Sequence, residues 1–395
     1  MNNLYQIPAG FKSSGIGPIP GDWEVIELGN IFKLSSGKTK PKDLSEYPSN
    51  ENKYPIYGGN GILGYANVFN SEGERIIIGR VGEYCGITRF INEPCWITDN
   101  ALVVKDFLKD IDVQFLVYKL QQDNISKLRS KGGQPLVSQN PIYIHKIAIP
   151  TRKNEQTAIA ALLRIWDNAI SKTTALITQK EFRKKWLMQQ LLSGKKRISG
   201  FNGEWKLIHI SEVSKEVSIK NKTDKDLPVL SCTKYDGLVP SLEYFGRKIF
   251  ADDLTTYKVV PRNHFAYATN HIEEGSIGYQ ENFDEALISP MYTVFKTDSS
   301  INDYFFYKLL KSYRCIYEYQ AWMEGSIDRR GGLRWEAFSR IKVHLPSLEE
   351  QTAIAQVLKV TDKEIGQLKT KLDKLKEQKK GLMQVLLTGK KRLII

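Results

Sequence analysis

The sequence contains few of the residues that disulfides and metal sites require. Its four cysteines, Cys85, Cys95, Cys232 and Cys315, form no Cys-x-x-Cys pair and have no histidine nearby at the spacing of metal ligands. Because such spacing is the usual sign of a zinc site, we expect free, buried thiols and no bound metal.

Long hydrophobic runs are also absent. No run approaches the ~20 apolar residues that a membrane-spanning helix needs. The first residues, MNNLYQIPAGF, have neither the basic nor the apolar region of a signal peptide. These absences predict a cytoplasmic protein with no membrane partner.

Common catalytic motifs are absent as well. There is no GxxxxGK(S/T) phosphate loop and no HExxH, and none of the five histidines lies near a Ser or Cys in a context that suggests a triad. Residues 59–64 (GNGILG) match GxGxxG, with Glu83 about 20 residues further on, but a dinucleotide site requires a helix to begin at these glycines. Residues 65–80 read as turn and strand instead. We therefore predict no catalytic residue and no cofactor.

One tetrapeptide leaves an enzymatic alternative open. Residues 140–143 (NPIY) are close to the Asn-Pro-Pro-Tyr loop with which amino-group DNA methyltransferases hold a flipped base. The second proline is missing, and no strand-loop-helix segment offers a site for S-adenosylmethionine. Chance similarity is the better interpretation, and a stand-alone adenine DNA methyltransferase remains the alternative function.

What the sequence does contain is a long segment that occurs twice. Residues 155–198 begin EQTAIA and end LLSGKKRI, and residues 350–393 begin EQTAIA and end LLTGKKRL, at a constant offset of 195 residues with no gap. Both copies are rich in helix-forming residues. Gly194 and Gly389 stand where a helix C-cap favours a left-handed residue, and the Lys-Lys-Arg that follows suits the negative end of the helix dipole.

Each copy carries apolar residues at alternating spacings of four and three. This pattern specifies a coiled-coil seam, so each helix is expected to pack lengthwise on another. A buried core helix is the alternative, and the many Lys and Arg residues on both flanks disfavour it. The apolar seam positions are Ile159, Leu163, Trp166, Ile170, Ile177, Leu187 and Leu191 in the first copy and Ile354, Leu358, Ile365, Leu368, Leu372, Leu375, Leu382 and Leu386 in the second.

The positive charge of the chain is concentrated on these two segments. The formal net charge is +13, and essentially all of the excess lies within residues 152–200 and 348–395. A solvated helix face explains any single charged residue equally well. The concentration as a whole indicates a polyanionic partner.

The segments between the helices also come in two, more diverged copies. Residues 21–28 (GDWEVIEL) and 203–210 (GEWKLIHI) open the two blocks, and each block closes with a glycine pair and a short strand ending in proline. We expect two α+β domains of about 150 residues, in an α+β fold with the order domain, helix, domain, helix. The expected boundaries are 1–150, 151–198, 199–347 and 348–395.

Within the blocks, turn signals separate short strands that precede one helix. The first block is expected to have strands at 75–79, 95–98 and 101–104 and a helix at 110–130. The second is expected to have strands within 250–260, 264–268 and 289–295 and a helix at about 301–322.

Gly-rich, basic and aromatic loops of both blocks are the candidates for contact with nucleic acid. Arg and Lys contact phosphates and guanine edges, Asn and Gln read adenine, and aromatic rings stack. For any one residue, an ordinary solvated loop is the competing interpretation. The candidates are Lys38, Lys40, Tyr57, Asn60, Arg80, Arg89, Lys131, Gln134, Ser138 and Gln139 in the first block and Lys220, Lys222, Lys234, Arg247, Asn270, His271, Arg329, Arg330 and Arg334 in the second.

Taken together, two diverged α+β blocks, each followed by a helix with EQ-x-x-IA at its start and LL-(S/T)-GKKR at its end, resemble the specificity subunit of a type I restriction-modification system. The resemblance covers nearly the whole chain. It extends to residues 57–62 and 78–82 of the first block and to 270–277 and 289–292 of the second, which resemble target recognition domains of that family.

The resemblance implies that each block reads one half of a split, asymmetric sequence in double-stranded DNA. It also implies that the helices pair antiparallel, giving a tandem pseudo-twofold repeat with a ruler between the domains. The partners implied are two modification subunits, which methylate adenine, and restriction subunits, which translocate DNA with ATP. A coiled-coil scaffold that binds no DNA is the remaining alternative.

Overall fold

The computed structural model describes residues 7–130, 133–222, 226–324 and 332–393. The chain divides into two compact units, each of which contains one globular domain and parts of both long helices. Unit 1 comprises residues 1–174 and 370–395, and unit 2 comprises residues 175–369. Among the described residues, no helix combines the length and apolar composition that crossing a bilayer requires.

Unit 1 is built on a four-stranded antiparallel sheet with the order β4-β10-β7-β8. A three-stranded sheet, β6-β5-β9, lies on part of one of its faces, and the helix α1 packs on the other. Its strands are β1 (Phe11–Lys12), β2 (Ile19–Pro20), β3 (Trp23–Glu27), β4 (Phe32–Ser36), β5 (Tyr54–Gly58), β6 (Gly61–Ala66), β7 (Glu74–Gly79), β8 (Thr88–Asn92), β9 (Trp96–Ile97), β10 (Ala101–Phe107) and β11 (Lys146–Pro150), and its helices are η1 (Leu28–Asn30), α1 (Val113–Asp123), η2 (Ile125–Leu128) and α2 (Gln139–Tyr143).

Unit 2 repeats this framework with its own loops. The four-stranded sheet has the order β13-β21-β18-β19, and the first and last strands of the domain, β12 and β22, pair with each other as β3 and β11 do. The strands are β12 (Lys206–His209), β13 (Ser214–Val217), β14 (Ile219–Lys220), β15 (Leu230–Thr233), β16 (Gly237–Pro240), β17 (Lys258–Pro261), β18 (His264–Ala268), β19 (Ile277–Gln280), β20 (Glu285–Ile288), β21 (Tyr292–Thr297) and β22 (Lys342–Leu345), and the helices are η3 (Ile210–Glu212), α4 (Ser241–Phe245), η4 (Ile272–Glu274), α5 (Asp303–Leu310), α6 (Tyr313–Glu324) and α7 (Trp335–Phe338).

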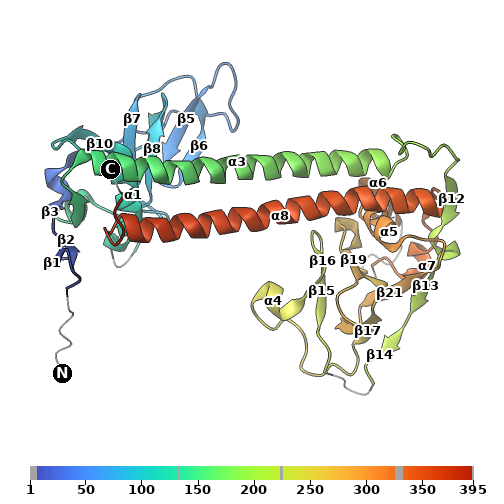
Figure 1. The fold of residues 1–395 in the computed structure, drawn as a ribbon. Helices are drawn as coiled ribbons and strands as arrows, with labels where there is room; N and C mark the ends of the chain where they lie inside the picture. Colours follow the sequence, from blue (N-terminus) through green and yellow to red (C-terminus); the bar gives the residue numbers. More distant parts are fainter. Residues whose placement is uncertain (1–6, 131–132, 223–225, 325–331, 394–395) are drawn as a thin grey trace, which may run out of the picture. The chain divides into compact units, whose positions relative to one another are not determined.

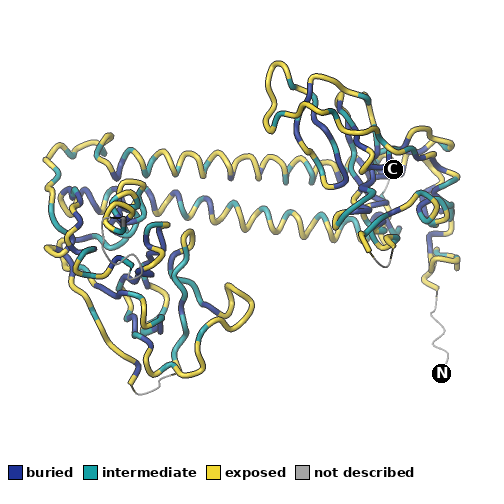
Figure 2. Tube along the Cα trace, turned by 180° about the vertical axis from the view of Figure 1, so that it is seen from behind, coloured by how far each residue is buried: buried dark blue, intermediate teal, exposed yellow. Residues whose placement is uncertain are grey.

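Burial follows the period of each element. Along β10, Leu102 and Val104 face the core under α1, whereas Lys105 is exposed. Figure 2 shows buried and exposed stretches alternating along the chain. Fully burying a Leu, Val or Phe side chain contributes about 1.5–3 kcal/mol, so these faces supply much of the stability of each unit. In unit 2, stacked aromatic rings also contribute to this stability. The ring centroids of Phe265 and Phe295 lie 4.9 Å apart, and the angle between the ring planes is 12°.

The two long helices are α3 (Lys153–Leu191) and α8 (Leu348–Leu386). In unit 1 the first part of α3 lies antiparallel beside the last part of α8, and in unit 2 the last part of α3 lies antiparallel beside the first part of α8 (Figure 1). All seam positions are buried or half-buried. Thr173 and Thr361 also fall at the four-three spacing of the seam, and their hydroxyls donate to the carbonyls of Ala169 and Val357.

Both long helices end in left-handed glycines, as predicted. Gly194 and Gly389 each have φ +69°, and their amides donate to the carbonyls of Leu191 and Leu386. A Cβ on Gly389 would also clash with the ring of Pro20, so the position requires glycine for two reasons.

The predicted domain helices are shorter than the sequence pattern indicates. The helix expected at 110–130 stops at Asp123, because Asn124 adopts a left-handed conformation with φ 57° and a 3-10 turn follows. The helix expected at 301–322 is two helices, α5 and α6, because the chain leaves helical geometry at Lys311. The hydrophobic periodicity continues across the breaks at Asn124 and Lys311, so the sequence pattern did not predict them.

Two predicted strands of unit 2 were also too long. In the segment 250–260 only the last residues pair, as β17, while residues 250–257 form bends and turns. In the segment 289–295 pairing begins at Tyr292, because Ser289 and Pro290 form a turn in which the amide of Tyr292 donates to Ser289.

Candidate nucleic-acid interface

In unit 1, three loops from distant parts of the sequence meet at one edge of the sheets. The turn between β5 and β6 approaches the end of β7 so closely that a Cβ on Gly79 would lie 2.5 Å from the carbonyl oxygen of Gly59. The amide of Val137 donates to the carbonyl of Arg80, which adds the segment before α2 to the group. Gly59 and Gly79 therefore allow the backbone of the β5–β6 turn to pack closely against the end of β7. This packing accounts for the glycines without a phosphate-binding role.

Two candidates in this group point inward and support the loops. Arg89 is half-buried and its guanidinium donates to the carbonyl of Gly59 at 3.2 Å, while burial lowers its pKa. The hydroxyl of Tyr57 donates to Glu93 at 2.8 Å, and burial, reinforced by this carboxylate, raises the pKa of Tyr57. Arg89 therefore holds the β5–β6 turn, whereas Tyr57 ties β5 to the segment after β8. Asn60 is exposed at the tip of the turn.

The remaining candidates of unit 1 differ in exposure. Arg80 is half-exposed and donates to the Ser36 hydroxyl at 3.2 Å, at the end of β4. Lys38, Lys40, Gln134 and Ser138 are exposed, and Gln139 is half-buried at the start of α2. Lys131 lies outside the described residues.

In unit 2 a comparable group forms around the loop after β18. Leu333 donates its amide to the carbonyl of Thr269, and a Cβ on Gly332 would lie 2.5 Å from that carbonyl. Asn270 and His271 are exposed on this loop, and Arg334 is exposed beside it as the residue before α7. Arg329 and Arg330, predicted to act with Arg334, lie outside the described residues.

Four further candidates of unit 2 lie on other elements. Lys220 ends β14, Lys222 follows it, and Arg247 follows α4, all three exposed. Lys234 is exposed in the turn between β15 and β16, where its carbonyl accepts a hydrogen bond from the Lys311 ammonium at 2.8 Å. Burial lowers the pKa of Lys311 to about 8.

One group of side chains in unit 2 has the composition of a metal site. Within the described chain, ligand atoms of His271, Glu273 and Glu274 lie within 4.8 Å of one another. The Glu273 carboxylate oxygen Oε2 is buried without a hydrogen-bond partner among described residues. His271 and Glu274 are exposed, and we assign no metal to this group.

Neither motif considered for chemistry has the geometry that its chemistry needs. Residues 59–64 span the β5–β6 hairpin, so no helix amides face these glycines. Residues 140–143 lie in α2, and the Tyr143 hydroxyl accepts the amide of Leu34 at 2.8 Å. Tyr143 therefore ties α2 to β4 instead of presenting itself to a base.

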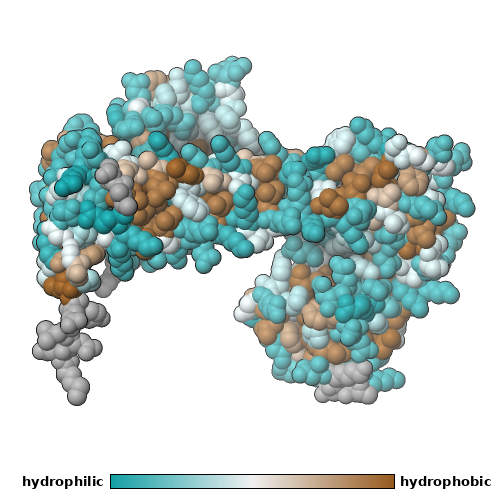
Figure 3. All heavy atoms as spheres, viewed as in Figure 1, coloured by the Kyte–Doolittle hydropathy of each residue, from teal (hydrophilic) through white to brown (hydrophobic). Residues whose placement is uncertain are grey.

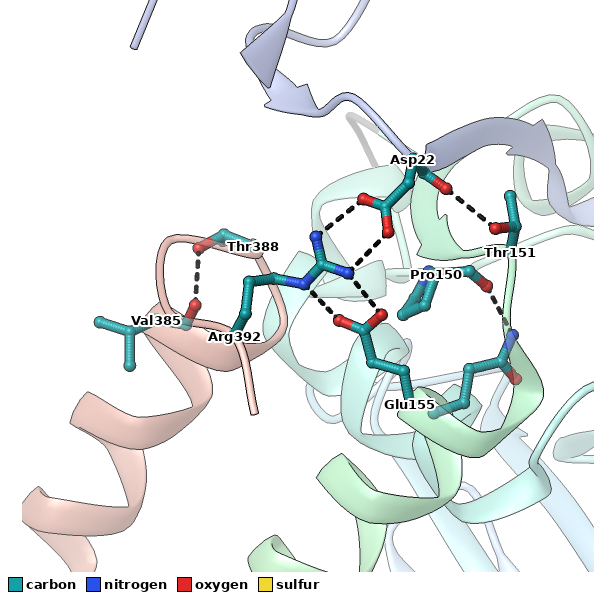
Figure 4. A network of polar contacts seen from close by, with 8 residues as sticks. Asp22, Pro150, Thr151, Glu155, Val385, Thr388 and Arg392 are labelled. Carbon is teal, nitrogen blue, oxygen red and sulfur yellow. Dashed lines mark hydrogen bonds and ion pairs between the residues drawn. The ribbon is translucent and has the colours of Figure 1, made fainter. Parts of the chain in front are cut away.

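Sequence reasoning missed how the ends of the long helices are held. Arg392 donates to both carboxylate oxygens of Glu155 at 2.6 and 2.7 Å, and to both of Asp22 at 2.7 and 2.8 Å (Figure 4). Its guanidinium lies 6.0 Å from the centre of the Trp23 ring. These three charged residues, which we call the unit 1 end clamp, join the end of α8, the start of α3 and the first strands of the domain.

The same contact recurs in unit 2. Arg197 donates to both carboxylate oxygens of Glu350 at 2.5 and 2.6 Å and to the carbonyl of Gly203, with the Trp205 ring 5.7 Å away. Arg197 and Glu350 form the unit 2 end clamp. The arginines were expected at the carbonyls of their own helix, but the carboxylate in the first turn of the neighbouring helix offers a bidentate acceptor, which binds guanidinium more strongly.

A second pair of equivalent contacts ties each domain to the helices. In unit 1, Asp167 accepts the Tyr118 hydroxyl at 2.5 Å and the Lys379 ammonium at 2.6 Å. In unit 2, Asp362 accepts Tyr304 at 2.6 Å and pairs with Lys184 at 2.5 Å. The signal in the sequence was identity at an offset of 195, because Glu155, Asp167, Lys184 and Arg197 recur at 350, 362, 379 and 392.

The chain resembles known proteins over most of its length. The family model for the type I restriction modification DNA specificity domain matches it twice, over residues 20–179 and 202–377. The EcoprrI type I restriction enzyme specificity subunit of Escherichia coli is 29% identical over 148 residues, which are 37% of this chain and 36% of that protein. The MjaVIII specificity subunit of Methanocaldococcus jannaschii is 26% identical over 407 residues, covering 95% of this chain and 94% of that protein.

A solved structure shares the fold. The crystal structure of the type I restriction-modification S subunit from M. genitalium aligns with a TM-score of 0.63 and 18% identity, over 96% of this chain and 99% of that one. The duplicated framework, with one helix following each α+β domain, is thus found in a solved specificity subunit. Since the family model covers both copies of the repeat, the chain belongs to the family of type I restriction modification DNA specificity domains.

Proposed function

We propose that residues 1–150 and 199–347 are two target recognition domains, each of which reads one half of a bipartite, asymmetric DNA sequence. The observation that carries the proposal is that the two units share their framework, end clamps and Asp-Tyr-Lys contacts but differ in their exposed loops. Two domains that read different half-sites need different loops on the same support. A protein that reads chromosomal DNA in this way would act in the cytoplasm.

The bases would be read by exposed side chains on the loops described above. Asn60 and Arg80 in unit 1, and Asn270 and Arg334 in unit 2, offer the amide and guanidinium groups that pair with adenine and guanine edges. Arg89 and Tyr57 would act indirectly, since the Arg89 guanidinium binds the turn that carries Asn60 and the Tyr57 hydroxyl ties the strand before that turn to Glu93.

In this proposal the subunit recognises DNA and other subunits carry out catalysis. Two modification subunits would dock on the helices, joined by restriction subunits. Ile165 and Val360 occupy equivalent positions of the repeat and are 64% and 56% exposed, so each unit offers the same apolar contact to one copy of a partner. Hydrophobic groups interrupt the hydrophilic surface along the helices in the space-filling view (Figure 3).

The experiment that tests the proposal is an exchange of one domain. Residues 201–347 are replaced by the corresponding segment of a relative, and methylated adenines are mapped genome-wide in a host that also carries the modification subunit. We expect one half of the methylated sequence to change while the other half and the spacer stay the same. A change of bases in both halves would refute independent reading by the two domains.

A further inference from the structure

The four-stranded sheet of unit 1 has one face that is only partly covered. Ile77 and Ala101 on this face pack against Ile97 and Cys95 beneath the smaller sheet. Beyond this contact lies an open cavity of about 590 Å³ that includes Val103 in its wall. Its volume falls within the ~300–1,000 Å³ that ligand sites commonly have.

The wall of this cavity is rich in cations and hydroxyl groups. Lys38, Arg75 and Lys105 line it together with the side chains of Ser35 and Ser71. No ion pair joins any of the three cations to another described residue, and the Arg75 guanidinium donates only to the carbonyl of Glu74, at 2.8 Å, among described groups. Glu72 is the single carboxylate of the wall, so the cavity is cationic within a domain whose net charge is nearly zero.

We propose that this cavity seats the sugar–phosphate backbone of DNA beside the half-site that unit 1 reads. The proposal rests on the proposed function. Ser36 lines the cavity, and its hydroxyl also accepts a hydrogen bond from the Arg80 guanidinium. The cavity therefore borders the loops that would read bases. Lysine, arginine and serine are the groups that commonly bind phosphate oxygens and fix the register of a protein on the duplex.

The cavity therefore adds Arg75 and Lys105 to the interface, neither of which lies on a Gly-rich loop. They stand on β7 and β10, the strands whose opposite faces form the core under α1. Cations on rigid strands would hold the DNA sugar–phosphate backbone at a fixed position relative to the loops. Asn60 and Arg80 could then contact base edges in a defined geometry.

The test uses the full chain assembled with its modification subunit. Lys38→Ala and Lys105→Ala each remove one cation that is exposed and carries no fold-stabilising ion pair among described residues. The logarithm of the DNA association constant is measured against the logarithm of salt concentration. Two DNAs are compared, one that contains the sequence that the complex methylates and one that lacks this sequence. Each substitution should reduce the slope by about 0.9 and weaken binding to both DNAs alike, with the methylated sequence unchanged.

Lys127→Ala is the matched control, because this lysine is also exposed in unit 1 but lies on η2, outside the cavity. It should leave the slope unchanged. Unaltered slopes for both cavity variants would overturn the inference, as would a change in the methylated bases, which would mean that the cavity reads bases. Binding of inorganic phosphate that both variants lose, without any effect on DNA, would also overturn it in favour of a free anion. Failure of the wild-type complex to prefer any sequence would instead refute the proposed function.

Discussion

Removing Arg392 should destabilise unit 1 more than its exposed position suggests. The Glu155 side chain is only 6% exposed, so Arg392→Ala leaves a buried carboxylate without its bidentate partner. Breaking a buried pair by removing one member costs about 3–5 kcal/mol. Because the Arg392 side chain is itself 40% exposed, water can reach the vacated space, and we expect about 3 kcal/mol. At about 2–4 °C per kcal/mol for a unit of this size, the melting temperature of unit 1 should fall by about 6–12 °C.

The assay is calorimetry on the full chain, with hydrogen exchange to show which unit has loosened. Exchange should accelerate in the first turns of α3, where Glu155 lies, and Lys390→Ala, which removes an exposed cation from the same segment, should have no effect. The double variant Glu155→Gln/Arg392→Ala should recover part of the loss, since no buried charge remains unpaired. A melting temperature unchanged by Arg392→Ala would refute the reasoning.

Three further predictions concern the helices. Burial raises the pKa of Asp362, but hydrogen bonds from Lys184, Lys308 and Tyr304 outweigh it and lower that pKa to about 2. The free energy of unfolding of unit 2 should therefore fall by about 2 kcal/mol as pH falls from about 4 to about 2, and melts of Asp362→Asn should lack this dependence. Gly389→Ala should cost more than Gly194→Ala in denaturant titrations, because both add left-handed strain of about 1 kcal/mol but only the first adds a clash with a proline ring. Inserting one heptad near both Thr178 and Asp373 preserves the seam and lengthens the helix pair by about 10.5 Å. Mapped methylation should then show an unread spacer between the half-sites that is longer by about two to three base pairs, or methylation should be lost. An unchanged spacer would mean that the helices do not set it.

The fold was predictable because its signals are periodic or repeated. Alternating spacings of four and three residues predicted two paired helices, and every apolar seam position from Ile159 to Leu386 is at least half-buried. The glycines at 194 and 389 predicted both helix ends, since few other residues adopt φ near +69°. Repetition of the whole pattern then predicted two similar α+β domains.

Contacts between distant segments were not predictable in the same way. Arg89 is a candidate for DNA contact, and the sequence did not show that its guanidinium binds the carbonyl of Gly59, 30 residues away. Arg197 and Arg392 looked like caps of their own helices, because helix-dipole arguments consider only one helix. Their partners, Glu350 and Glu155, become neighbours only after the helices pair.

The end clamps also explain how the loops that are candidates for DNA contact can differ so much between the units. Each clamp joins the start of one long helix to the end of the other and also contacts the start of a domain, through Asp22 in unit 1 and through the Gly203 carbonyl in unit 2. Neither clamp uses a loop that is a candidate for DNA contact. The loops, in turn, bond among themselves, as Arg80 does with Val137. Sites that share no partners contribute nearly additively to stability. If these loops read the bases, as we propose, a substitution in a loop can therefore change which bases are read and leave the free energy that holds the domain on its helices nearly unaffected.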